Sequence, residues 1–144
     1  DEEGFYEARW FAGGELRFRL AEAGPLRVGF LICTELMFNE HARRYGRAGA
    51  ELLLVPRATG RASLERWLVA TRMAAIVSGA YVASSNRGGV DERGQEFGGC
   101  GWIVDPHGDL VARTSATSPV AFHELDLAWV KRAQREYPCY VKDP

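Results

Sequence analysis

Cys33 is the residue of this sequence best placed to act as a nucleophile. It follows the apolar run Leu26–Ile32 and is itself followed at once by Thr34 and Glu35. A run rich in Leu, Val, Ile and Phe predicts a strand buried on both faces. The helical spacing that follows predicts a helix closing on Gly49. Cys33 is therefore expected on a strand-to-helix turn, where the helix N-terminus favours a thiolate.

Polar residues also end two later apolar runs. Arg57 follows the run Glu51–Pro56, and Ser85 and Asn86 end the run that begins at Ala80. If the three strands are parallel, their carboxyl ends lie at one edge of the sheet and can face one pocket. A thiolate, an acid and hydrogen-bonding side chains are the parts needed for acyl transfer through a thioester. We expect Glu35, Arg57 and Asn86 to contact the substrate. Arg57 would bind a carboxylate or another polar group of the substrate.

Each of these residues also has a structural interpretation. A single cysteine at a strand end is often a buried structural residue, and Glu35 could cap the helix that follows it. Arg57 could instead pair with a local acid. We interpret Cys100 and Cys139 as structural.

The remaining pattern predicts the elements that position these side chains. Strands and helices alternate first, and a hairpin and one more strand follow, which predicts an α/β fold with a mixed sheet. The expected elements are a strand at 16–20, a helix from Ser63 to a stop at Gly79, a hairpin of 101–105 with 110–114, a strand at 120–125 and a terminal helix at 127–136.

Composition narrows the possible function classes. The chain has 144 residues, enough for one domain, and its net charge of -1 argues against general binding to nucleic acid. No apolar run approaches the roughly 18–20 residues that span a bilayer, so no membrane partner is expected. The three cysteines are an odd number without zinc-ligand spacing, which favours a reducing, cytoplasmic location and predicts no metal and no cofactor.

Five segments, in order, resemble the carboxyl-terminal half of the nitrilase superfamily, the carbon–nitrogen hydrolases. The resemblance implies an α-β-β-α sandwich of the nitrilase type, represented here by roughly its second half. It also implies amide or nitrile hydrolysis by a Glu-Lys-Cys triad. The segments are 4–11 (Gly-Phe-Tyr-Glu-Ala-Arg-Trp-Phe), 28–35 around Cys33, 39–56, 72–88 with Tyr-Val-Ala-Ser-Ser-Asn-Arg-Gly, and 97–108.

The resemblance also implies roles for individual residues. Cys33 would attack the carbonyl or nitrile carbon, and the backbone N–H of Thr34 would contribute to the oxyanion hole. Glu7 matches a second, supporting glutamate near the nucleophile in some members. The family commonly has an aromatic residue at the position of Thr34, so the pocket is expected to be more open there.

The same resemblance places the general-base Glu and the catalytic Lys before Asp1. Residues 1–144 are therefore expected to be a single carbon–nitrogen hydrolase domain whose amino-terminal portion is absent. The expected substrate is a small amide, carbamoyl compound or nitrile, and the protein is expected to form a homo-oligomer. The alternatives are a catalytically incomplete fragment or interaction module and, more remotely, a redox role for Cys33.

Overall fold

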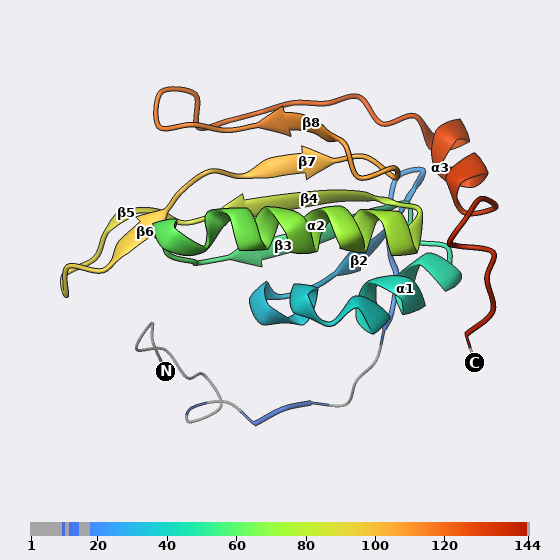
Figure 1. Ribbon diagram of the computed structural model, residues 1–144, viewed down its shortest axis with the longest axis horizontal. Helices are drawn as coiled ribbons and strands as arrows, with labels where there is room; N and C mark the ends of the chain where they lie inside the picture. Colours follow the sequence, from blue (N-terminus) through green and yellow to red (C-terminus); the bar gives the residue numbers. More distant parts are fainter. Residues whose placement is uncertain (1–9, 11, 15–17, 144) are drawn as a thin grey trace.

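The computed structural model describes residues 10, 12–14 and 18–143, and the prediction for Glu7 lies outside this part of the chain. Its main feature is a six-stranded sheet in the order β1-β2-β3-β4-β7-β8 (Figure 1). The strands are β1 (Ala21–Ala23), β2 (Leu26–Phe30), β3 (Leu52–Arg57), β4 (Tyr81–Asn86), β7 (Trp102–Val104) and β8 (Leu110–Arg113).

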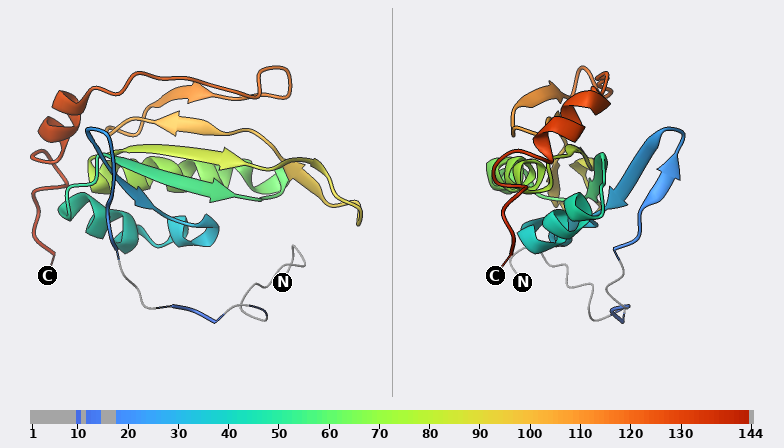
Figure 2. Two further views of the ribbon diagram at one scale, coloured as in Figure 1. Left: turned by 180° about the vertical axis from the view of Figure 1, so that it is seen from behind. Right: turned by 90° about the vertical axis from the view of Figure 1, so that its right-hand side faces the viewer.

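The sheet is mixed, as predicted. The three central strands β2, β3 and β4 run parallel, and β1, β7 and β8 pair antiparallel at the two sides. Parallel neighbours need crossover connections, and these contain α1 (Asn39–Arg47) and α2 (Leu64–Ser78). Both helices lie on the same face of the sheet (Figures 1 and 2). Two short 3-10 helices precede them, η2 (Cys33–Met37) and η3 (Arg61–Ser63).

The hydrophobic core fills the space between these helices and the sheet. Its sheet side consists of alternate residues of the strands, among them Trp102 of β7, and its helix side includes Trp67 of α2. α1 and α2 approach closely at Gly46, where an added Cβ would lie 2.3 Å from the backbone oxygen of Ser78. The large side chains of the sheet that are fully buried are Leu53, Val55, Tyr81, Val82 and Val104.

The opposite face of the sheet is much less covered by the described residues. The register places Phe30, Leu54, Ala83 and Ile103 in one row across four strands. Phe30 is 44% exposed, and Ile32, two residues further along, is 55% exposed. The expectation that these strands are buried on both faces is therefore wrong on this face, because Phe30 is exposed and Leu54, Ala83 and Ile103 are only partly buried.

Most helix and strand predictions agree with the structure, but the strand at 120–125 and the described part of the strand at 16–20 do not. α2 has Ser63 at its N-cap position and ends at Gly79, whose φ of 62° favours glycine. The hairpin of β7 and β8 forms as predicted. The strand predicted at 120–125 is wrong, because this segment pairs with no strand and Phe122 is 89% exposed.

Three smaller features complete the fold. The strand expected at 16–20 is absent from residues 18–20, and β1 forms directly after them. A two-stranded sheet of β5 (Gly88–Val90) and β6 (Glu96–Gly98) extends beyond the main sheet (Figure 1). α3 (Leu127–Ala133) packs at the far end. No helix of the described residues has the length and apolar character of a membrane span.

Candidate active site

Cys33 lies on a tight turn at the carboxyl end of β2. The turn begins just after Leu31, whose N–H donates to Leu54 O at 3.0 Å and keeps the chain beside β3. Cys33 has a φ of 48°, in the left-handed region that residues other than glycine rarely adopt. Such a conformation persists only where the surrounding structure fixes it, and it is enriched at functional sites. η2 starts at Cys33 itself, so the thiol belongs to the first residue of this helical turn.

Glu35 closes this turn. Its Oε2 accepts a hydrogen bond of 2.7 Å from the N–H of Ile32, and its own N–H donates to Ile32 O at 3.0 Å. Glu35 therefore binds the backbone of Ile32, the residue before Cys33, which is the capping role that the sequence left open. Thr34 is exposed at the second position of η2. An N–H in the first turn of a helix has no partner within the helix and can donate to an oxyanion.

The structure brings the ends of β2, β3 and β4 to one edge of the sheet. Phe30 is the last residue of β2 and pairs with Leu54, and Cys33 follows three residues later, while β3 continues to Arg57. Arg57 in turn pairs with Asn86 on β4. Arg57 and Asn86 thus lie side by side at the edge of the sheet at which β2 also ends, shortly before Cys33.

Arg57 is buried at this edge, with 6% of its surface exposed. Its Nε donates to Ser84 Oγ at 2.8 Å, its Nη1 to Thr59 Oγ1 at 2.9 Å and its Nη2 to the carbonyl oxygen of Cys100 at 2.9 Å. The guanidinium lies over the Trp102 ring, 3.9 Å from its centroid. Burial lowers the pKa of Arg57 to about 10, and the nearby Cys100 and Cys33 thiols oppose this shift.

Asn86 is also held by internal hydrogen bonds. Its Oδ1 accepts from the N–H of Thr59 at 2.9 Å, and its Nδ2 donates to Gly99 O at 2.7 Å. Together with Arg57, it ties the loop after β3 and the loop before β7 to the sheet edge. The sequence predicts that both residues bind the substrate, whereas the structure places their polar atoms in this internal network. The sequence did not identify Thr59 or Trp102 as members, and their only signal is their position next to strand ends.

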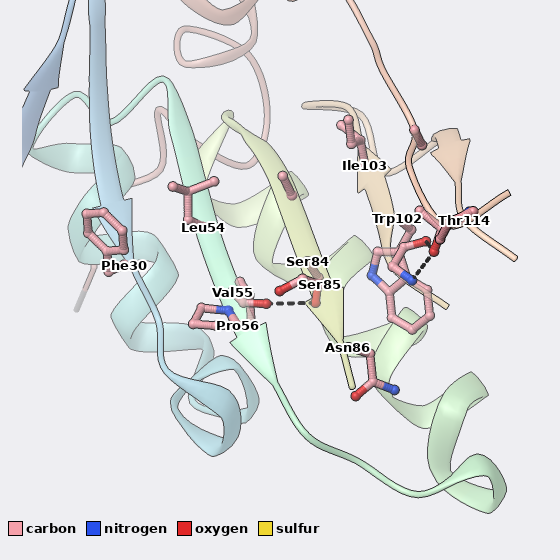
Figure 3. Close-up of a pocket in the computed structure, with 14 residues that line it drawn as sticks. Phe30, Leu54, Val55, Pro56, Ser84, Ser85, Asn86, Trp102, Ile103 and Thr114 are labelled. Carbon is pink, nitrogen blue, oxygen red and sulfur yellow. Dashed lines mark hydrogen bonds between the residues drawn. The ribbon is translucent and has the colours of Figure 1, made fainter. Parts of the chain in front are cut away.

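Two hollows adjoin this edge, each of about 470 Å³. The first lies on the open face of the sheet and is lined by Phe30, Leu54, Pro56 and Asn86 among others (Figure 3). The second includes Cys100 and Arg113. Cys33 lines neither of them. The described residues therefore leave the nucleophile turn at the side of an open surface and do not enclose it in a pocket.

The two other cysteines have different surroundings, and all three are free thiols. Cys100 Sγ accepts from Nε of Arg113 at 2.8 Å, and this hydrogen bond raises the pKa of Arg113. Cys139 Sγ donates to Ile76 O at 3.4 Å beside the end of α2. Burial raises the pKa of Cys139. No group of three or more His, Cys, Asp or Glu side chains in the described ranges is arranged to hold a metal ion.

Comparison with known proteins identifies what this chain is similar to. The family model described as carbon-nitrogen hydrolase matches residues 2–135. Deaminated glutathione amidase of Mus musculus is 30% identical over 115 residues, which are 79% of this chain and 36% of that protein. Omega-amidase NIT2 of Homo sapiens is 26% identical over 140 residues, covering 94% of this chain and 49% of that protein.

A solved structure agrees with these matches. The carbon-nitrogen hydrolase from Helicobacter pylori G27 superposes with a TM-score of 0.86 at 27% sequence identity, over 95% of this chain and 53% of that one. The predicted α/β fold with a mixed sheet is thereby confirmed. The chain spans between about a third and a half of the length of the curated relatives described above.

Proposed function

Because the chain belongs to the carbon-nitrogen hydrolase family, we propose that the protein hydrolyses a non-peptide carbon–nitrogen bond in a small molecule, with Cys33 as the nucleophile. The observation that carries this proposal is the turn at Cys33, a left-handed non-glycine residue at the edge of three parallel strands. This geometry supports the proposal because the partly buried thiol of Cys33 begins a helical turn, whose first N–H groups can donate to an oxyanion.

The chemistry follows from these parts. The Cys33 thiolate forms a bond to the carbonyl carbon of an amide, and the resulting oxyanion accepts hydrogen bonds, one of them from the N–H of Thr34. The carbon–nitrogen bond then breaks, and the nitrogen leaves with a proton as ammonia or an amine. Water attacks the thioester, releases the acid and returns the thiol. With a nitrile, the first adduct is a thioimidate.

Proton transfer in this scheme requires groups beyond the described residues. We propose that a general-base Glu and a Lys are supplied by the rest of the native protein, and that Glu7 supports them. The open face of the sheet favours this arrangement, since its row of apolar residues offers a surface on which a second layer can pack. Homo-oligomerisation and a cytoplasmic location stay predictions from the sequence.

Amides are the substrate class that we favour. Both curated relatives described above carry amidase names, whereas nitriles and N-carbamoyl compounds are supported only by the resemblance to the wider superfamily. Glu35 and Asn86 stay candidates for substrate contacts, although their observed hydrogen bonds are internal.

Turnover by the native-length protein tests the proposal. Ammonia release should be measured with a panel of small amides, N-carbamoyl compounds and nitriles. We expect release from at least one amide, loss of that release in Cys33→Ala, and unchanged release in the matched control Cys139→Ala. Equal activity of the two variants would contradict the assignment of the nucleophile. A folded native-length protein without activity on any compound would favour the alternative of an interaction module.

A further inference from the structure

We propose that Glu35 is a positioning residue, whose side chain holds the turn that carries Cys33 and thereby fixes the thiol and the N–H of Thr34 in place. The proposal rests on the proposed function in treating Cys33 as the nucleophile. It gives Glu35 a role that needs no contact with a substrate, in contrast to the role that the sequence predicts.

The first support is that the turn is short and is fixed in the core at both ends. Leu31 and Leu36 are fully buried, and Leu31 N donates to Leu54 O at 3.0 Å. The residues between the two leucines, 32–35, are exposed or only partly buried. Packing of the core therefore fixes where the turn begins and where it ends, but it does not fix the backbone between these points.

The second support is a pair of hydrogen bonds by which Glu35 closes the turn. Its N–H donates to Ile32 O at 3.0 Å, and its Oε2 accepts from Ile32 N at 2.7 Å. Both bonds join the same two residues and enclose Cys33 and Thr34 between them. A hydrogen bond to an ionised carboxylate is roughly twice as strong as one between neutral groups. The Glu35 side chain therefore restrains the stretch of backbone that contains the nucleophile.

The third support is that the conformation of Cys33 requires a restraint. Its φ of 48° lies in the left-handed region, which is unfavourable for a residue with a Cβ. Return to an ordinary backbone conformation would turn both the thiol of Cys33 and the N–H of Thr34. Because a misplacement of about 1 Å can lower a rate about a hundredfold, a restraint on this turn acts on the reaction itself.

Glu35 is well anchored for this role. Its carbonyl oxygen accepts from Phe38 N at 3.2 Å, and the next residue, Leu36, is fully buried. The backbone of Glu35 is therefore held by η2 and the core, and its side chain reaches back to Ile32. A substrate that bound Oε2 would compete with this hydrogen bond, whereas a positioning role requires no rearrangement.

The test compares Glu35→Gln with Glu35→Ala in the native-length protein. Gln keeps an acceptor oxygen at the same distance along the side chain and loses the charge, whereas Ala loses both. With an amide that the protein hydrolyses, kcat should fall about a hundredfold in the Ala variant and stay close to wild type in the Gln variant. KM should change little in either variant, because no substrate contact is lost. The matched control is Glu40→Ala, which removes an exposed carboxylate from α1 and should leave kcat unchanged.

A substrate contact through the charge of Glu35 predicts a different pattern. The Gln variant would then lose as much activity as the Ala variant, or KM would rise while kcat stayed the same. Equal losses in the two variants would overturn the proposal. Wild-type kcat in Glu35→Ala would also overturn it.

Hydrogen exchange of the Ile32 amide tests the restraint without turnover. Ile32 is 55% exposed, so its amide should exchange slowly only if the bond to Glu35 forms. We expect exchange to be about tenfold faster in Glu35→Ala than in the wild type, the effect of losing a hydrogen bond to a charged group. The Leu31 amide, which is bonded to Leu54 O, should be unchanged.

An unprotected Ile32 amide in the wild type would overturn the proposal even if neither variant folds. Equal protection of this amide in the wild type and in Glu35→Ala would do the same. Loss of its protection in Glu35→Ala, with no ammonia release from any compound by the wild type, would contradict the proposed function and support the restraint on the turn.

Discussion

The two faces of the central sheet differ sharply. Leu53 and Leu54 are adjacent on β3, yet Leu53 is fully buried beneath α1 and α2, whereas Leu54 lies half-buried on the open face. On the covered face, both helices and three parallel strands pack into one core. The open face shows a row of apolar side chains that a second layer could cover. The covered face therefore stabilises the fold, and the open face and its edge are available for packing and chemistry.

The largest expected effect is a difference between Leu53→Ala and Leu54→Ala. Leu53→Ala removes a side chain from a filled core and should lower the free energy of unfolding by about 3 kcal/mol. Leu54→Ala should cost less than about 1 kcal/mol in the isolated chain, because its side chain is already partly hydrated. Urea unfolding of both variants checks this, and equal losses would mean that the open face is covered in solution.

Gly46→Ala should be nearly as harmful. The new Cβ would overlap the backbone of Ser78 at 2.3 Å, and helix backbones cannot move apart without opening the core. We expect a loss of about 3 kcal/mol, the upper part of the range for overpacking. Gly88→Ala, whose Cβ meets only Gly99 at 3.5 Å, is the matched control and should cost much less. Thermal unfolding of the two variants would show whether the contact between α1 and α2 is as tight as described.

Glu7→Gln should affect activity and leave stability unchanged. The resemblance to the family implies that Glu7 is a supporting glutamate near the nucleophile. In the native-length protein, kcat should fall roughly tenfold, a small value for a positioned acid or base. Steady-state kinetics with an amide substrate checks this, and wild-type kcat would reduce Glu7 to a loop residue.

The smallest expected effect concerns Cys139 on the helical side. Burial beside α2 raises the pKa of its thiol, so a smaller fraction is ionised at pH 8 than in an exposed cysteine. We expect alkylation at pH 8 to be severalfold slower than that of N-acetylcysteine, with the difference narrowing as the pH approaches 10. Equal alkylation rates of Cys139 and N-acetylcysteine at pH 8 would show that the segment around Cys139 moves away from α2 in solution.

Local patterns in the sequence predicted the elements that depend on near neighbours. The apolar run before Cys33, the stop of α2 at Gly79 and the hairpin of β7 and β8 all follow from periodicity and turn chemistry. The strand predicted at 120–125 does not form, because a strand needs a partner strand as well as a suitable sequence pattern. The exposure of Phe30 could not be predicted from the sequence either, because its burial depends on whether another layer of the structure packs on this face of the sheet.

The candidate site shows the same division. The position of Cys33 on a strand-to-helix turn follows from sequence order alone. The actual contacts of Arg57 and Asn86 do not, because their partners at Cys100 and Gly99 lie 43 and 13 residues away along the chain. Polar residues at strand ends can serve a substrate or a scaffold, and only the three-dimensional arrangement distinguishes these uses.

Trapping the covalent intermediate tests the central claim most directly. The native-length protein is mixed with an amide that it hydrolyses, quenched in acid within the first turnovers, digested and analysed by peptide mass. The account predicts the mass of the acyl group on the peptide that contains Cys33 and on no other. An acyl group on Cys100 or Cys139, or sustained turnover with no acylated peptide at any quench time, would contradict it.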